Sequence, residues 1–263
     1  MHRDGKKGQA DAQTAGPDRS PCTACPVREL AFCASLDARS QAVLRQMSQQ
    51  IPVTTGQLLA EEGQINAPFM MVVAGVVELA KRLPDGRRQV MGFRFPGEIV
   101  TVPCSETASR VSAHAVTPGT VCQIDVGAFW HLVRSDPKIS LRLLAVACEE
   151  IAATQDQIML LRRKSATERV AHFIAHLPGR GQADGNVVEM VMKRQDMADY
   201  LGLTTETVSR ALATLRAEEI VHLADRRHAV IDDPAALEQL AHGGEAAGAG
   251  NEQGENSENG ELT

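Results

Sequence analysis

The hydrophobic pattern changes period twice along the 263 residues, and this limits the folds that are possible. From Ile51 to about Ile124, short apolar runs are separated by glycine and proline turns, spaced about ten residues apart. Such a pattern is typical of an antiparallel sandwich or barrel. We therefore expect a β domain from about Ser48 to Asp125.

The second region, from Asp136, has a helical period over about 30 residues. Its seam positions recur at alternating steps of three and four, and they are Leu144, Ala147, Ile151, Thr154, Ile158 and Leu161. This seam predicts either a helix packed on its own sheet domain or a coiled coil in a homodimer. Thr154 favours the homodimer, because a polar seam position weakens and tunes association.

The third region has the pattern of a winged helix-turn-helix. The expected elements are a helix over about 167–176, a strand within 187–192, a helix over 195–201, a second helix from Thr204 to about 218, and two wing strands over 221–223 and 229–231. Gly202 supplies the sharp turn between the last two helices, and Thr204 can cap the second. The expected core is Met197, Leu201, Leu203, Val208, Leu212 and Leu215.

The N-terminal part of the second helix carries a polar face, Glu206, Ser209 and Arg210, at positions i, i+3 and i+4. This is where a recognition helix meets base edges, and arginine can bind guanine with two hydrogen bonds. An alternative is an ordinary solvated face, on which Glu206 and Arg210 pair with each other. The complete set of candidate DNA-binding residues is Thr205, Glu206, Ser209, Arg210, Arg226 and Arg227.

Three of the six cysteines crowd the start of the chain as Cys22-x-x-Cys25-x7-Cys33. The surrounding residues are polar and turn-rich, with no core to fill, so the thiols indicate a metal or redox site. Residues 1–16 are charged and lack the apolar run of a secretion signal, so we expect the reducing cytoplasm. Zinc and an iron–sulfur cluster are both compatible with such ligands.

The net charge of −6 argues against a generally basic nucleic-acid coat, but a local basic patch is still possible. No apolar run reaches the roughly 18 residues that a membrane helix needs. The segment from Gly243 to Thr263 contains five glutamates and no apolar face, so we expect it to be disordered.

The segment from Arg194 to Arg210, RQDMADYLGLTTETVSR, resembles the DNA-binding signature of the Crp/Fnr regulator family, and its Glu-Thr-Val-Ser-Arg core is similar to the Fnr branch. The resemblance extends from about Cys22 to Leu240. It implies an α+β fold with an N-terminal antiparallel β-roll of the cyclic-nucleotide-binding type, a long dimerisation helix and a C-terminal winged helix-turn-helix. The expected parts are a disordered tail (1–20), a cysteine-rich cluster-binding segment (21–47), a sensory β-roll (48–135), a dimerisation helix (136–164), the DNA-binding domain (165–240) and a disordered acidic tail (241–263).

The resemblance also implies an oxygen-labile [4Fe-4S] cluster, with Cys22, Cys25, Cys33 and Cys122 as its ligands. The seven residues between Cys25 and Cys33 exceed the spacing of the enterobacterial type and are similar to Fnr-like regulators of α-proteobacteria. Of the other cysteines, Cys104 is a spare thiol or an alternative fourth ligand, and Cys148 is expected to be a buried or half-buried filler.

Three rival functions find less support. A cyclic-nucleotide sensor would carry an arginine followed by a hydroxyl residue, whereas here Ser109-Arg110-Val111-Ser112 follows Gly97-Glu98. A haem sensor would use His114 or His131, but neither lies in a haem motif. An enzyme would need a phosphate loop, a Ser/His/Asp set or paired carboxylates, and no such frame is recognisable.

The implied function is that of an oxygen-responsive transcriptional regulator, an activator or a repressor, of genes for anaerobic or microaerobic metabolism. Cluster binding would order Cys22 to Cys33 against the β-roll and one flank of the long helix, and would shift the balance from monomer to dimer. The dimer would bind double-stranded DNA at inverted repeats with TTGAT-like half-sites and would work with RNA polymerase.

Overall fold

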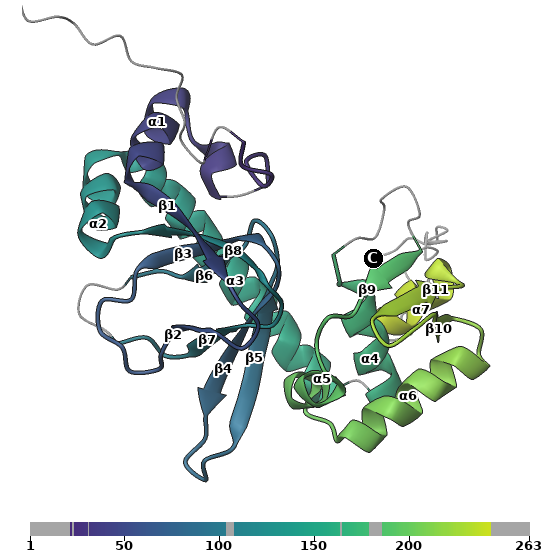
Figure 1. Cartoon of the computed structure of the whole chain (residues 1–263). Coiled ribbons are helices and arrows are strands. Elements are labelled where there is room, and N and C mark those ends of the chain that lie inside the picture. Colours follow the sequence, from purple (N-terminus) through teal and green to yellow (C-terminus); the bar gives the residue numbers. More distant parts are fainter. Residues whose placement is uncertain are drawn as a thin grey trace, which may run out of the picture. The chain divides into compact units, whose positions relative to one another are not determined.

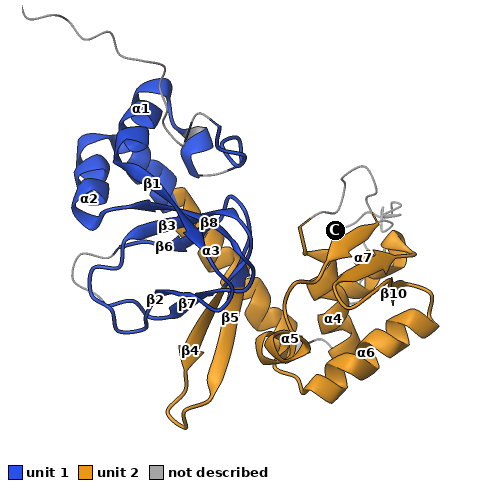
Figure 2. Cartoon of the chain, in the orientation of Figure 1, with its two compact units in different colours: residues 1–77, 93–144 blue, residues 78–92, 145–263 orange. Residues whose placement is uncertain are grey.

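The computed structural model describes residue 22 and residues 24–30, 32–103, 108–163, 165–178 and 186–242. The chain divides into two compact units (Figure 2). We call residues 1–77 with 93–144 the N-terminal unit, and residues 78–92 with 145–263 the C-terminal unit. The predicted tail 1–20, Cys104, and residues 243–263 of the predicted tail 241–263 lie outside the described residues.

Eight strands form the predicted β-roll (Figure 1). They are β1 (Ser48–Val53), β2 (Leu58–Ala60), β3 (Phe69–Ala74), β4 (Val77–Arg82), β5 (Arg88–Arg94), β6 (Ile99–Thr101), β7 (Ser112–Ala115) and β8 (Gly119–Ile124). One sheet has the order β1-β8-β3-β6 with antiparallel pairing, and the other has the order β2-β7-β4-β5. The expected antiparallel sandwich is confirmed.

The turn between β3 and β4 shows why glycine is needed there. Gly75 has φ +85°, in the left-handed region that favours glycine. A Cβ at Gly75 would also lie 2.8 Å from the carbonyl oxygen of Pro118. The backbone of this turn therefore packs directly on the turn before β8.

Two helices of the N-terminal unit were not predicted. Helix α1 (Ala38–Met47) lies in the cysteine-rich segment and follows a short 3-10 helix, η1 (Phe32–Ser35). Helix α2 (Val126–Ser135) begins directly after β8, and the Asp125 carboxylate caps it by accepting hydrogen bonds from the N–H groups of Gly127 and Ala128. The expectation that Cys22, Cys25 and Cys33 sit in a tail without a core is wrong, because Val27 and Phe32 are buried.

Helix α3 (Pro137–Arg163) has 27 residues and follows the helical period closely. Proline stands at its first position, where the missing N–H costs nothing. At 1.5 Å per residue the helix is about 40 Å long. In the part of the chain that the structure describes, no helix combines the length and the apolar character that crossing a membrane requires.

The rest of the C-terminal unit is a three-stranded sheet surrounded by helices. Its elements are α4 (Ala166–Ala175), β9 (Val187–Glu189), α5 (Arg194–Leu201), α6 (Thr205–Ala217), β10 (Val221–Leu223), β11 (His228–Ile231) and α7 (Pro234–Ala241). The sheet order is β10-β11-β9, with antiparallel pairing. The last helix runs one residue past the predicted domain end at 240.

Candidate nucleic-acid interface and cysteine pocket

Helices α5 and α6 form a helix-turn-helix around a glycine turn. Gly202 has φ 63° and ψ 39° and ends α5 in the left-handed conformation, and its N–H donates to the Ala198 carbonyl. The Thr204 hydroxyl caps α6 by accepting a hydrogen bond from the N–H of Thr207 at 3.2 Å. Met197, Leu201, Val208 and Leu215 are fully buried between the helices, as expected, whereas Leu203 is only half-buried.

The predicted reading face of α6 is open to solvent. Glu206, Ser209 and Arg210 are exposed, and Thr205 is half-buried. A hydrogen bond from Thr204 is the largest of the causes that lower the pKa of Glu206, and the charge of Arg210 is the smallest. Pairing with Arg210 is therefore not the main interaction of this carboxylate.

The wing turn presents two arginines beside an ordered carboxylate. Asp225 accepts hydrogen bonds from the backbone N–H groups of Arg227 at 2.6 Å and His228 at 2.9 Å, and from Nδ1 of His228 at 2.8 Å. These contacts lower the pKa of Asp225, the bond from Arg227 first. Because Asp225 shapes the turn, Arg226 and Arg227 remain exposed at its tip.

A cleft between α6 and β10 adds two arginines that the sequence analysis missed. It has a volume of about 250 Å³ and is lined by Arg194, Ser209, Leu212, Ala213, Arg216, Val221 and Leu223. Burial lowers the pKa of Arg194, whose Nη1 lies 3.3 Å from the Met197 sulfur. Arg216 lies seven residues after Ser209, on the same helix face, and this spacing is the signal that could have identified it.

The four predicted cluster ligands line one pocket of the N-terminal unit. Cys22, Cys25 and Cys33 come from the N-terminal segment, and Cys122 lies on β8 opposite Gln50 of β1 and Met71 of β3. Cys122 is 5% exposed, whereas the other three are half-buried. The further lining residues are Arg28, Gln41, Leu44, Arg45, Gln50 and Met71.

Apolar contacts hold the cysteine segment on the sheet. The ring of Phe32 lies 5.6 Å from that of Phe69 on β3, and Phe69 stacks on Phe129 of α2 at 4.9 Å. Leu30 packs on Gly97, where a Cβ would lie 3.3 Å from that of Leu30. These contacts, which no local pattern encodes, bring Cys22 to Cys33 next to Cys122.

Two thiols of the pocket, those of Cys122 and Cys33, have a raised pKa. Burial, followed by the charge of Cys22, raises the pKa of Cys122 to about 12, while the Ser48 hydroxyl opposes the shift. Burial likewise raises the pKa of Cys33. Ser48 Oγ also lies 3.2 Å from Cys22 Sγ. A metal would therefore have to displace protons when it binds.

Among the described residues, no group of three or more His, Cys, Asp or Glu side chains is arranged to hold a metal ion. A tetrahedral zinc site needs its sulfur ligands about 2.3 Å from a single point. The four thiols thus surround a common pocket without converging on one centre.

Comparisons with known proteins identify the family. The model of the Crp-like helix-turn-helix domain matches residues 168–240, and that of the cyclic nucleotide-binding domain matches residues 50–136. The chain is 35% identical over 230 residues to the nitrogen fixation regulation protein FixK of Bradyrhizobium diazoefficiens. The aligned region covers 86% of this chain and 95% of that protein. It is 31% identical to the transcriptional activator protein FnrL of Cereibacter sphaeroides, over 82% of this chain and 90% of that protein. The chain belongs to the Crp/Fnr family.

A solved Crp/Fnr structure agrees with the fold. FixK2 from Bradyrhizobium japonicum gives a TM-score of 0.69 at 31% identity, over 77% of this chain and 99% of that one. The chain is therefore a DNA-binding transcriptional regulator and not an enzyme. The predictions of family, fold class and non-enzymatic function are confirmed.

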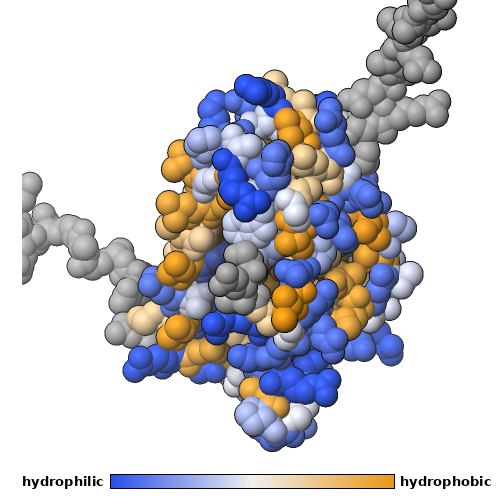
Figure 3. All heavy atoms as spheres, turned by 90° about the vertical axis from the view of Figure 1, so that its left-hand side faces the viewer, coloured by the Kyte–Doolittle hydropathy of each residue, from blue (hydrophilic) through white to orange (hydrophobic). Residues whose placement is uncertain are grey.

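The predicted seam of this Crp/Fnr chain is largely uncovered. Ile151 is 59% exposed, and Leu144, Ala147, Thr154 and Ile158 are exposed as well. Leu161 is half-buried, and its Cδ2 lies 3.6 Å from where a Cβ on Gly202 would stand. On one face of the molecule, hydrophobic residues lie in separate patches among hydrophilic ones (Figure 3).

One expectation about a single residue of α3 needs correction. Cys148 is exposed in the single chain, so it is not the buried or half-buried filler that was expected. The Thr154 hydroxyl donates to the Glu150 carbonyl of its own helix at 2.7 Å. Both side chains are exposed in the single chain.

The residues of the rival sensors are also placed by the structure. Glu98 accepts a hydrogen bond from the Phe95 N–H at 3.0 Å and so closes its own turn. Arg110 and His131 are exposed, and His114 is half-buried. Residues 104–107 of the same region lie outside the described part of the chain.

Proposed function

We propose that this Crp/Fnr regulator responds to oxygen through a [4Fe-4S] cluster held by Cys22, Cys25, Cys33 and Cys122. The observation that supports the proposal is that all four thiols line one pocket, although Cys122 is distant from the others in sequence. Four cysteine thiolates are the usual ligands of such a cluster. The number of thiols in the pocket and their chemistry therefore fit a [4Fe-4S] cluster.

The surroundings of the thiols fit it as well. Leu44 and Met71 give the pocket apolar walls, which limit the access of water. Arg28 and Arg45 add two positive charges beside it, which offset the negative charge of a thiolate-ligated cluster. The soft sulfur ligands favour iron–sulfur chemistry over hard cations.

The pocket must open to take the group. Its volume is about 30 Å³, roughly that of one water molecule. The segment that carries Cys22, Cys25 and Cys33 contains turns and a short 3-10 helix rather than a strand of the sheet. Because the β8 ladder fixes Cys122, we infer that this segment, rather than Cys122, shifts when the cluster binds.

Polar contacts connect this segment to the start of α3. Lys138 Nζ donates to the Asp37 carboxylate at 2.6 Å, and Ser40 donates to Asp136. The Lys138 contact holds the pKa of Asp37 well below its usual range, so the carboxylate stays charged in mildly acid solution. Asp37 caps α1, and Ser40 lies in the first turn of this helix. A shift of the cysteine segment would thus reach the dimerisation helix through α1.

The exposed seam of α3 is the surface for a second chain. Five large apolar side chains on this helix are exposed, namely Leu141, Leu144, Ile151, Ile158 and Met159. An apolar stripe of this kind is costly in water and marks an interface. We infer that two chains pair along it, and that the dimer places two α6 helices on successive major grooves.

The proposed dimer reads an inverted repeat with TTGAT-like half-sites. Arg210 would bind the guanine, Glu206 would accept from the opposite cytosine amino group, and Ser209 would meet a neighbouring thymine or phosphate. The sugar–phosphate backbone of the DNA would be contacted by Thr205, Arg226 and Arg227. RNA polymerase is the proposed partner through which bound protein activates or represses genes of anaerobic or microaerobic metabolism.

When bound, the cluster supplies lability toward oxygen, and the protein supplies the coupling to DNA. The test is to purify the full chain without oxygen and to measure iron, acid-labile sulfide and zinc. We expect about four iron and four sulfide per chain, and an absorption band that is lost in air. Zinc without sulfide, or protein without metal, would contradict the cluster while leaving the DNA-binding function intact.

A further inference from the structure

Helix α5 has its free carbonyl groups satisfied by side chains from three other elements of the C-terminal unit. The last carbonyls of a helix have no partner within it. Here the amide of Gln89 on β5 donates to Asp199 O, Gln157 of α3 donates to Tyr200 O at 3.3 Å, and Arg169 of α4 donates to Leu201 O at 3.1 Å. The end of α5 is therefore bonded to β5, α3 and α4 together.

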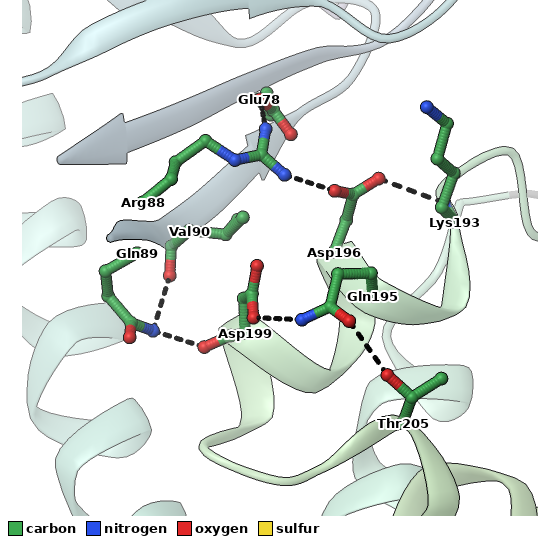
Figure 4. A network of polar contacts seen from close by, with 9 residues as sticks. All are labelled: Glu78, Arg88, Gln89, Val90, Lys193, Gln195, Asp196, Asp199 and Thr205. Carbon is green, nitrogen blue, oxygen red and sulfur yellow. Dashed lines mark hydrogen bonds and ion pairs between the residues drawn. The ribbon is translucent and has the colours of Figure 1, made fainter. Parts of the chain in front are cut away.

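Arg88 of β5 holds the start of α5. Asp196 accepts a hydrogen bond from the Lys193 N–H at 3.1 Å with one carboxylate oxygen, and from Arg88 Nη2 with the other. Arg88 Nη1 donates to Glu78 on β4 (Figure 4). Glu78 is 5% exposed and Asp196 is 7% exposed. Without Arg88, two buried carboxylates would face each other with no cation between them, which is unfavourable.

The contacts continue from α5 to the helix that reads DNA. Gln195 donates to the Asp199 carboxylate at 2.7 Å, and the Thr205 hydroxyl donates to Gln195 Oε1 at 2.9 Å (Figure 4). Thr205 is the first residue of α6. Polar contacts therefore run from Gln89 of the β4–β5 hairpin (78–92) through Asp199 and Gln195 of α5 to the N-terminus of α6.

We propose that Arg88 is a positioning residue for DNA recognition, acting through Asp196 of α5. The hairpin fixes α5 at both ends, and α5 fixes the N-terminal turn of α6, where the base-reading residues lie. The contacts that carry this role lie within one chain and do not involve the cysteine pocket. The role is thus independent of the cluster and of the state of oxidation.

Hydrogen exchange of the full chain without DNA tests the contact directly. Arg88→Ala should speed exchange of the α5 amides by about 10- to 100-fold, the range expected for losing a hydrogen bond between charged groups. Arg87→Ala is the matched control, because it removes the same charge one residue earlier from a side chain that is 77% exposed and bound to Asp85. Exchange of the β8 amides should stay unchanged in both variants.

Two further variants keep the test decisive. In an Asp196→Asn background, Arg88→Ala should have a much smaller effect, since the charged partner is already absent. If Arg88→Ala does not fold, Arg88→Lys keeps the charge but is unable to hold both carboxylates with a planar fork, and should give intermediate exchange. Exchange in α5 that equals that of Arg87→Ala would overturn the proposal.

DNA titration separates positioning from direct contact. Arg88→Ala should weaken binding to an inverted repeat by about tenfold or more without changing the slope of affinity against salt. Loss of a phosphate contact would instead lower that slope by about one. A lowered slope with unchanged α5 exchange would show that Arg88 touches DNA itself and would overturn its role as a positioning residue.

Discussion

The four pocket cysteines differ in burial, but each is expected to be needed for the cluster. Replacing Cys22, Cys25, Cys33 or Cys122 by serine removes a soft ligand, so iron per chain should fall to near zero in each variant. Cys148→Ser is the control and should keep full iron, because Cys148 is exposed on α3. Full iron in Cys122→Ser would transfer the fourth ligand role to Cys104.

Base reading and phosphate contact should be separable on the DNA-binding surface. Arg210→Ala should cost about 1–3 kcal/mol per half-site and relax the preference at the G·C pair. Arg226→Ala should weaken binding to all sequences alike and reduce the salt dependence. Titration against the repeat and a G·C-substituted repeat, at two salt concentrations, measures both. Equal loss on both sites for Arg210→Ala would make this face a phosphate anchor only.

Single residues were predictable from sequence when their role depends on local spacing. Glu206, Ser209 and Arg210 share a helix face, and the structure shows that face exposed. That Cys122 lies with the N-terminal cysteines was predicted only from the family resemblance. Local spacing does not predict it, because the position of Cys122 depends on the pairing of β8 with β1. The bond between Arg88 and Asp196 was not predictable, since nothing in either local sequence names a partner so far along the chain.

At the scale of elements, the seam of α3 gives the sharpest test. Ile151→Glu places a charge where two chains would bury it, so the variant should be a folded monomer that binds an inverted repeat poorly. Gln155→Glu adds a negative charge to an exposed position of the same helix off the seam, and should remain dimeric. Anaerobic sedimentation decides the matter. An unchanged dimer mass for Ile151→Glu would show that the stripe serves another purpose.

Elements with a clear helix cap and a regular hydrophobic period were predictable from the sequence. Short helices that are held in place by contacts distant in sequence were not. The turn at Gly202 and the cap at Thr204 fix α5 and α6 locally, so their bounds agree with the prediction to within about a residue. Helix α1 buries only Ser40 and Leu44, which leaves little periodic signal. The Asp125 cap was the available signal for α2.

At the scale of the whole molecule, the division into units differs from the predicted domains. The β4–β5 hairpin belongs to the sheet β2-β7-β4-β5 of the β-roll, as predicted, while residues 78–92 group with the C-terminal unit. Arg88 and Gln89 of this hairpin contact α5 within that unit. The net charge of −6 describes the whole chain and not its local surfaces. It is compatible with the arginines on the wing and in the cleft between α6 and β10.

The central claim is that one event at the cysteine pocket controls both dimerisation and DNA binding. The direct measurement is sedimentation of one anaerobic sample of the full chain with a labelled inverted repeat, before and after air, with Cys22→Ser alongside. We predict a DNA-bound dimer before air, a weakly binding monomer after it, and a monomer throughout for Cys22→Ser. A dimer that keeps its DNA after its cluster is lost would contradict the account.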